Sequence, residues 1–146
     1  MGQQQLLLVI LVTIIVGIAT VVAINTFGSA ADSATLDAVR QDMASIAASA
    51  QGYYMKPAML GGGSRDFEGI TFSDITFSGT INSDTEATNE NGTYTIPTVG
   101  ANSDDFVVTA VANDTDGTTI LARVCVDGIE MGDTDGSAPP NCGANS

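Results

Sequence analysis

Histidine is absent from the sequence, and basic residues are scarce. The 146 residues include 17 Asp and Glu but 4 Lys and Arg, which gives a formal net charge of −13. Because binding to nucleic-acid phosphates requires clustered Lys and Arg, this balance argues against a nucleic-acid partner. Without histidine, the chain lacks the commonest general base and a common metal ligand. We therefore expect no enzymatic activity and no cofactor.

Cysteine is almost as scarce, since the sequence contains two, Cys125 and Cys142. Two thiolates cannot complete a four-cysteine zinc site or an iron–sulfur cluster. No Cys-x-x-Cys-His run is present for covalent attachment of haem. The cysteine content therefore argues against a metalloprotein or a cytochrome.

Charged side chains are missing from residues 1–31 altogether. Within that stretch, residues 6–24 are all apolar except for two threonines and one glycine. This run approaches the roughly 20 residues that a helix needs to span a bilayer. In lipid an isolated segment must satisfy its own backbone hydrogen bonds, which favours a helix in spite of the many β-branched residues.

Three interpretations of this segment remain open. A cleaved secretory signal would carry Lys or Arg ahead of its apolar core, but the first basic residue here is Arg40. A plain membrane anchor is the simplest interpretation. The third is a helix that resides in the membrane first and later forms the core of a filament. The residues that follow favour the third.

After Phe27 the apolar residues become periodic instead of continuous. They fall three and four positions apart, on one stripe of a helix, at Leu36, Val39, Met43, Ile46, Ala50 and Tyr53. No proline occurs before Pro57, and three glycines follow at 61–63. The pattern predicts one helix over residues 3–55, about 80 Å long. Half of it would project from a head of this size and would need lipid or other helices around it.

The remainder of the chain predicts an antiparallel sheet of three to five strands. Residues 71–77 are rich in Thr, Phe and Ile, and Asn91-Gly92 is a hairpin signal ahead of residues 93–96. Residues 106–112 and 119–126 predict an antiparallel pair joined by a polar turn. Their apolar residues do not alternate cleanly, which suggests that both faces are partly covered.

Residues 127–146 are rich in Gly and Pro, so we expect them to lack regular structure. One face of the sheet should pack on the helical stripe. The predicted fold class is therefore α+β, with a long N-terminal α-helix on a C-terminal antiparallel β-sheet.

The first eight residues are Met1-Gly-Gln-Gln-Gln-Leu-Leu-Leu, and Tyr53-Tyr54-Met-Lys-Pro ends the predicted helix. With these motifs at the two ends of that helix, the chain resembles a mature type IV pilin or pseudopilin. The start Met1-Gly-Gln-Gln-Gln-Leu-Leu-Leu is similar to that of a processed pilin, and residues 40–54 resemble the amphipathic second half of bacterial pilin helices. Tyr53-Tyr54-Met-Lys-Pro, followed by three glycines, is similar to the join in a set of pilin-like proteins.

The resemblance implies how the chain is divided. Residues 1–56 would form the long helix, with residues 1–28 as the membrane and filament-core segment and residues 29–56 as the amphipathic half. A glycine-rich join would follow over residues 57–66. Residues 67–146 would form the β head, with a disulfide-closed C-terminal loop.

The resemblance also implies a function, that of a major pilin in an extracellular filament for adhesion or surface contact. A leader peptidase would expose Met1, and inner-membrane pilus assembly machinery would move subunits from the membrane into a homopolymer of identical chains. The residues expected between subunits are Leu8, Ile10, Leu11, Ile14, Ile15, Gly17, Ile18 and Val22. The alternatives are a pseudopilin or minor pilin of a secretion or DNA-uptake system, and a monomeric membrane-anchored surface protein.

Two positions depart from the family pattern. The family usually carries Glu at mature position five, where its carboxylate pairs with the N-terminal amine of a neighbour, but Gln5 stands there if Met1 is the mature first residue. An amide can hydrogen-bond an ammonium group but supplies no counter-charge. If Met1 is instead the initiator, processing would need a cut after Gly2, which we do not expect. The family's usual proline near position 22 is replaced by Val22.

The extracytoplasmic setting favours a disulfide between Cys125 and Cys142 over two free thiols. Such a bridge would hold the C-terminal tail against the sheet, stabilising it by roughly 3 kcal/mol in the chain-entropy model. A bridged C-terminal loop of this kind is also similar to that of many pilins.

Two further motifs have weak functional interpretations. Asp-Thr-Asp-Gly occurs twice, and its carboxylates are candidate calcium ligands at Asp114, Asp116, Asp133 and Asp135. Neither copy fits the EF-hand pattern, so solvated turns are the preferred interpretation and we expect no metal. Asn91 and Asn113 begin glycosylation triplets, although both also fit turns.

The missing proline leads to a first testable prediction. In many bacterial pilins that proline accompanies a melted stretch in the filament. Here Gly17, which costs about 1 kcal/mol in a helix, is the one obvious weak point in the segment. We expect the helix to stay continuous after assembly. A backbone trace of the assembled chain with an extended segment between residues 14 and 24 would contradict this.

Overall fold

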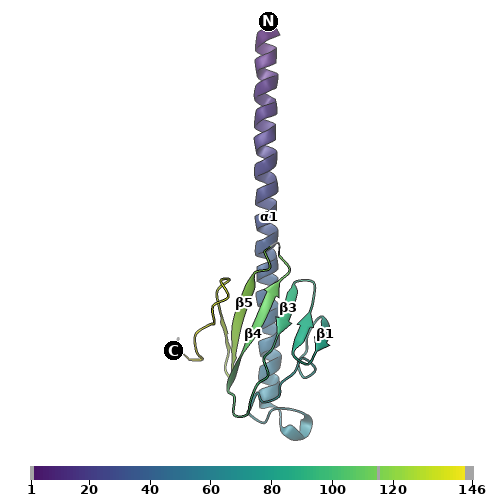
Figure 1. Cartoon of the computed structure of the whole chain (residues 1–146), viewed down its shortest axis with the longest axis vertical. Coiled ribbons are helices and arrows are strands. Elements are labelled where there is room, and N and C mark those ends of the chain that lie inside the picture. Colours follow the sequence, from purple (N-terminus) through teal and green to yellow (C-terminus); the bar gives the residue numbers. More distant parts are fainter. Residues whose placement is uncertain (1, 115, 144–146) are drawn as a thin grey trace. The chain divides into compact units, whose positions relative to one another are not determined.

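The computed structural model describes residues 2–114 and 116–143 (Figure 1). The chain divides into two compact units, Met1–Ala34 and Thr35–Ser146. The helix α1 (Gly2–Met55) contributes to both units, because the division falls inside it. One long apolar N-terminal helix and an antiparallel sheet confirm the predicted α+β class.

The helix ends at the predicted stop signal, and the join that follows is ordered by hydrogen bonds. Pro57 cannot continue the helix, and a single turn of 3-10 helix, η1 (Ala58–Leu60), follows it. The N–H of Gly63 then donates to the carbonyl of Tyr53 at 2.9 Å, which satisfies one of the last helical acceptors. A Cβ at Gly63 would overlap a backbone oxygen, so the close return of the chain requires glycine.

The second unit contains a single meander. Among the described residues each strand pairs antiparallel with the next, so the order in the sheet is the order in the sequence. The strands are β1 (Thr80–Ser83), β2 (Glu86–Thr88), β3 (Gly92–Thr95), β4 (Asp105–Ala112), β5 (Thr119–Cys125) and β6 (Ile129–Met131). The sheet therefore has six strands, more than the three to five predicted.

Residues 71–77 form turns, so the strand predicted there is wrong. The carboxylate of Asp74 accepts hydrogen bonds from the backbone N–H and the hydroxyl of Thr71, at 3.1 and 2.7 Å. These local bonds compete with strand pairing. Phe72 and Ile75, which suggested a strand, are buried in the hydrophobic core.

The tail also differs from the prediction, because β6 lies within the stretch expected to be irregular. Its register places Ile129 opposite Val124 of β5. Glycines flank the strand on both sides, and the Gly132 N–H donates to the carbonyl of Leu121 at 2.7 Å. Pairing with an existing edge thus imposes regular structure on a sequence with little preference for it.

The predicted pair of long strands is confirmed by β4 and β5, and their buried positions alternate with half-buried ones. The hairpin expected at Asn91-Gly92 also forms, between β2 and β3. Its register pairs Thr88 with Thr93, but Gly92 already belongs to β3, so the three residues 89–91 connect the strands.

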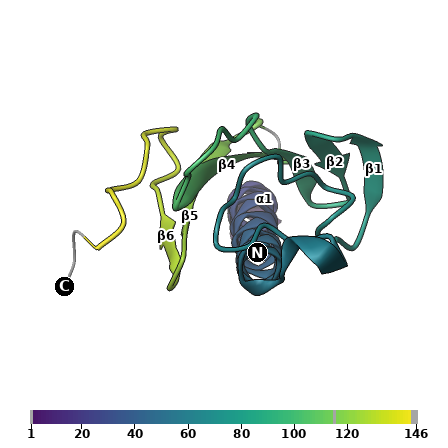
Figure 2. The ribbon, with the colours of Figure 1, turned by 90° about the horizontal axis from the view of Figure 1, so that it is seen from below.

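Residues 35–55 of α1 pack on one face of this sheet, which curves around them (Figure 2). The predicted stripe supplies the contact, because Val39, Met43 and Ile46 are fully buried. Each such side chain contributes about 1.5–3 kcal/mol on complete burial. The facing residues of the sheet include Tyr94, Val108 and others of the same core. The second unit therefore closes a hydrophobic core of its own.

Candidate functional site

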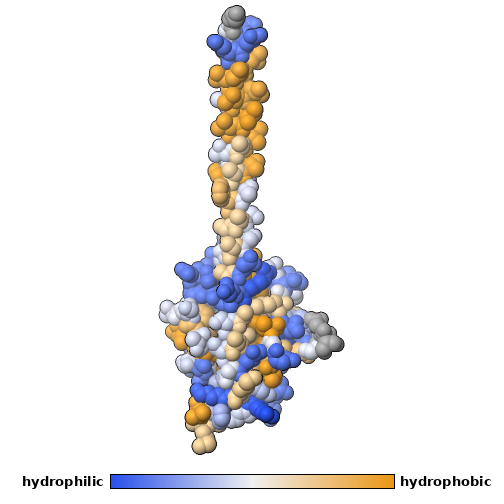
Figure 3. Space-filling model, turned by 180° about the vertical axis from the view of Figure 1, so that it is seen from behind, coloured by the Kyte–Doolittle hydropathy of each residue, from blue (hydrophilic) through white to orange (hydrophobic). Residues whose placement is uncertain are grey.

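Residues 2–34 of the first unit are all helical, and the apolar side chains among them are uncovered. From Leu6 to Ile24 the large apolar residues are 46–66% exposed, and Phe27 is 77% exposed. Figure 3 shows this hydrophobic surface along the helix, beyond the polar residues of its N-terminal tip. Over the described residues, α1 is the one helix long and apolar enough to cross a membrane. We call residues 6–27 the apolar helix surface.

The polar side chains inside the apolar helix surface are satisfied by the helix itself. The Thr13 hydroxyl donates to the carbonyls of Val9 and Ile10 at 3.0 and 2.8 Å. The Thr20 hydroxyl likewise donates to the carbonyl of Val16 at 2.8 Å. A buried hydroxyl costs free energy only when it lacks a partner. These threonines therefore leave the segment compatible with lipid or with a packed helical bundle.

All the residues predicted to lie between subunits fall on this surface, and each is exposed. They are Leu8, Ile10, Leu11, Ile14, Ile15, Gly17, Ile18 and Val22. Nothing lies within 4 Å of a Cβ added at Gly17, so the backbone there is open to close approach. Gln5 is exposed at the polar tip, and Met1 lies outside the described residues.

The apolar helix surface extends beyond the residues predicted to lie between subunits. Apolar side chains on the remaining sides of the helix are as exposed as the predicted ones, namely Leu6, Leu7, Val9, Val12, Val16, Val21, Ile24 and Phe27. The sequence already indicated these residues, since an uninterrupted run of apolar residues leaves no polar side on a helix. The surface therefore surrounds the helix and does not form a stripe.

The candidate calcium ligands serve the turns that contain them. Asp114 accepts a hydrogen bond from the Thr118 N–H at 2.9 Å, and hydrogen bonds from Thr118 lower its pKa. Asp135 accepts from the Ser137 N–H at 2.9 Å, and bonds from that serine lower its pKa. Asp116 and Asp133 are exposed. No group of three or more His, Cys, Asp or Glu able to hold a metal occurs within residues 2–114 and 116–143.

The two candidate glycosylation asparagines have their amide nitrogens engaged. Asn91 Nδ2 donates to the carboxylate of Asp42 at 2.8 Å. Asn113 Nδ2 lies 3.3 Å from the carbonyl oxygens of Asn89 and Glu90. Because a sugar would be attached at these nitrogens, both bonds favour the structural interpretation as turn residues.

Cys125 and Cys142 form a disulfide, with their Cα atoms 5.8 Å apart, as expected from the sequence. The bond joins the end of β5 to the tail beyond β6. Gln51 of α1 donates to the carbonyls of Cys125 and Gly128, at 3.1 and 3.2 Å. The bridge holds the tail beyond β6 to the end of β5, and Gln51 fastens the turn between β5 and β6 to α1.

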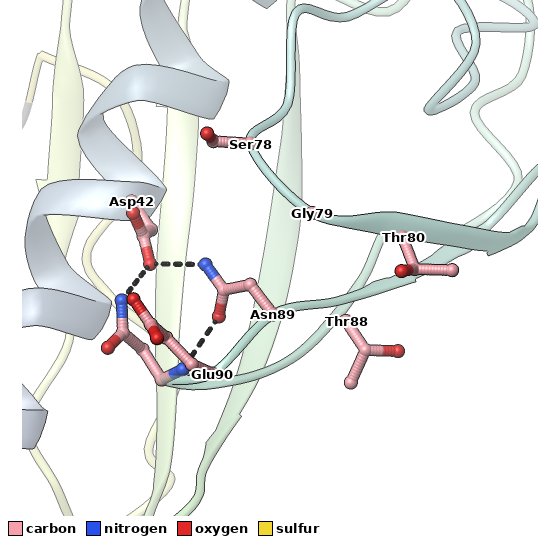
Figure 4. Close-up of a pocket in the computed structure, with 8 residues that line it drawn as sticks. Asp42, Ser78, Gly79, Thr80, Thr88, Asn89 and Glu90 are labelled. Atoms are coloured by element: carbon pink, nitrogen blue, oxygen red, sulfur yellow. Dashed lines mark hydrogen bonds between the residues drawn. The ribbon is translucent and has the colours of Figure 1, made fainter.

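A polar cluster around Asp42 fastens α1 to the turn between β2 and β3 (Figure 4). Asp42 Oδ2 accepts hydrogen bonds from the side-chain amides of Asn89 and Asn91, at 2.7 and 2.8 Å. The hydroxyl of buried Tyr94 donates to the same oxygen at 2.7 Å. Partial burial raises the pKa of Asp42, but these three donors outweigh it and leave the pKa below its usual value.

An open pocket lies beside this cluster. It is lined by Asp42, Ser78, Gly79, Thr80, Thr88, Asn89, Glu90 and Asn91. In Figure 4 Ser78, Thr80 and Thr88 stand apart from the hydrogen-bonded group. Since three internal donors already occupy Asp42 Oδ2, the cluster stabilises the fold, and the apolar helix surface remains the candidate functional site.

Comparisons of the chain with models of protein families, with curated proteins and with solved structures find no match.

Thr13 provides a test of the apolar helix surface. We expect Thr13→Val to leave membrane retention unchanged, because the hydroxyl is bonded within the helix and contributes no outward polarity. Thr13→Asp places a charge in the segment, at a cost of about 2.5–3.5 kcal/mol in a membrane helix. The measurement is the fraction of full-length chain left in alkali-washed membranes. Equal retention of the two variants would contradict the assignment.

Asp42 provides a test of the polar cluster. We expect Asp42→Ala to lower the free energy of unfolding by about 1–3 kcal/mol, because Tyr94 then keeps a buried hydroxyl without its partner. Since the folded-state pKa is lowered, the carboxylate stabilises the fold above its ordinary pKa of 3.8, and the contribution disappears as the pH falls below that value. The measurement is urea unfolding of the detergent-solubilised chain at pH 7 and at pH 3.

The matched control is Asp37→Ala, which removes an exposed carboxylate from the same helix. Asp37 pairs with Arg40 at 3.4 Å on the surface, so its loss should cost under about 1 kcal/mol. Equal effects of the two substitutions at pH 7 would show that the cluster does not stabilise the fold.

Proposed function

We propose that the chain is a structural subunit, a major pilin, of an extracellular type IV pilus-like filament. It polymerises through the apolar helix surface into a polymer of identical chains. Before assembly it resides in the inner membrane, where a leader peptidase and the pilus assembly machinery act on it. The second unit then forms the outer surface of the filament, where adhesion or surface contact takes place.

The observation that supports this proposal best is the solvent exposure of the apolar side chains in residues 6–27. Fifteen large apolar side chains of this segment are exposed around the whole helix. At about 1.5–3 kcal/mol for each side chain, covering them is worth on the order of tens of kcal/mol before the costs of association. A subunit with such a surface is stable only when lipid or other helices surround it.

Transfer from lipid to a bundle of identical helices requires a further source of free energy. Lipid tails are as apolar as leucine, so close packing replaces the hydrophobic effect as the driving force. The open backbone at Gly17 supports such packing, because small residues let helices approach closely. The absence of charged side chains over residues 1–31 supports it as well, since no charged side chain has to be buried.

The amide side chain of Gln5 sets this chain apart from the usual family pattern. Gln5 offers an amide that can accept a hydrogen bond from an ammonium group, without a full counter-charge. Burying an ion pair adds little stability after the cost of removing both charges from water, whereas removing one partner leaves a costly unpaired charge. In this proposal the register between subunits comes mainly from apolar packing along residues 6–27.

Electron microscopy of material sheared from cells tests the proposed function. We expect long uniform fibres that contain the chain. Short assemblies confined to the periplasm would favour a pseudopilin, and detergent-extracted monomers without fibres would favour a membrane-anchored surface protein. Either result would overturn the major-pilin proposal.

Ile14→Asp is the sharpest variant for this test. Within a bundle, it leaves an unpaired charge at a cost of several kcal/mol, so we expect filaments to be abolished. The matched control is Ser73→Asp, which adds the same charge at an exposed position of the second unit and should leave filaments intact. Both variants are compared by the amount of chain in the sheared fraction. Normal filament yield from Ile14→Asp would count against assembly through this surface.

A further inference from the structure

The four basic residues of the chain fall into two groups. Arg40 pairs with Asp37 at 3.4 Å, and Arg123 pairs with Asp105 at 2.5 Å. Lys56 and Arg65 are both exposed, and neither forms an ion pair within residues 2–114 and 116–143. On a chain with 17 acidic residues, two unpaired cations are a distinctive feature.

These two cations lie beside exposed apolar side chains of the second unit. Met59 is 97% exposed, Met55 72% and Leu60 65%. The five residues of this docking surface are Met55, Lys56, Met59, Leu60 and Arg65. Large apolar side chains that project into water next to charged groups are typical of an interaction site.

The docking surface is held by backbone hydrogen bonds. The Arg65 N–H donates to the carbonyl of Tyr54 at 2.7 Å, and the Ser64 N–H donates to the carbonyl of Lys56 at 3.0 Å. The Leu60 N–H donates to the carbonyl of Pro57 at 2.9 Å. Because these bonds already order the backbone where the chain folds back on the end of α1, binding a partner costs little further backbone conformational entropy.

The two turns at the opposite end of the sheet carry acidic residues and no basic ones. The turn from β2 to β3 carries Glu90, and the turn from β4 to β5 carries Asp114 and Asp116. The two turns are joined, since Asn113 N–H donates to the carbonyl of Asn91 at 2.8 Å. We call Glu90, Asp114 and Asp116 the acidic rim. Figure 1 shows these turns at one end of β4 and the loop after α1 at the other.

We infer that the docking surface binds the acidic rim of a second copy of this chain, head to tail. Charge complementarity selects this occupant: copies with a net charge of −13 repel one another except where Lys56 and Arg65 meet carboxylates. A pairing of two docking surfaces would instead place cations against cations. The exposed methionines supply apolar contact area, while the charges fix the orientation.

This arrangement has a consequence for assembly. Each copy carries one docking surface and one acidic rim, so head-to-tail contacts leave a free surface at either end of any oligomer. Heterologous contacts of this kind generate open helical polymers unless the rotation closes a ring. The inference therefore deepens the proposed function and rests on it. The apolar helix surface provides the core of the filament, and the contact between second units gives it a direction.

Charge reversal with rescue tests the contact. Lys56→Glu combined with Arg65→Glu should lower the filament yield in the sheared fraction about tenfold at equal membrane levels of the chain. Adding Glu90→Lys and Asp116→Lys restores complementarity and should return the yield to within about twofold of the unmodified chain. The control, Arg40→Gln, removes a positive charge away from the docking surface and should leave the yield unchanged.

The possible outcomes separate this inference from the proposed function. Unchanged yield after the double reversal, or loss without rescue, overturns the contact, while abolition of filaments by Ile14→Asp still supports the proposed function. No filaments from the unmodified chain overturns both. A third outcome is that the double reversal leaves the filament yield unchanged and abolishes binding of the chain to vesicles of anionic phospholipid. That result assigns the docking surface to a lipid partner and also overturns the contact.

Discussion

The need to cover an apolar helix on all of its sides is the constraint on which the rest of the structure depends. Residues 6–27 present leucine, isoleucine and valine around the whole circumference, and residues 1–31 carry no charged side chain. Water does not accommodate such a surface, whereas lipid tails and neighbouring helices do. The threonines fit the same requirement, because their hydroxyls donate to the backbone of their own helix.

The second unit is organised so that it does not depend on how that helix is covered. Residues 35–55 bury a single stripe against the sheet, and Asp42 fixes the helix to the turn after β2. The disulfide between Cys125 and Cys142 retains a tail with little structure of its own. Because this core closes within one chain, the second unit can keep its fold during the proposed transfer of the apolar helix from lipid to other helices.

Periodicity in the sequence predicted the parts of the fold that local chemistry decides, and missed those that packing decides. The helix, its buried stripe and the pair β4 and β5 follow from spacing and turn residues. Residues 71–77 misled the prediction because Phe72 and Ile75 fill the core from turns. β6 was missed because its order comes from pairing with β5. The apolar run indicated the candidate site, but the docking surface appears only when Gly63 folds the chain back onto α1.

The central claim is that residues 6–27 are covered by copies of the same chain, and site-specific photo-crosslinking tests it most directly. A photoreactive amino acid is placed at Ile15, which is 56% exposed, and the sheared filaments are irradiated. The account predicts adducts at multiples of the mass of the chain, attached within residues 6–27 of the neighbouring copy. Adducts with lipid alone, or chains that stay single after irradiation, would contradict it.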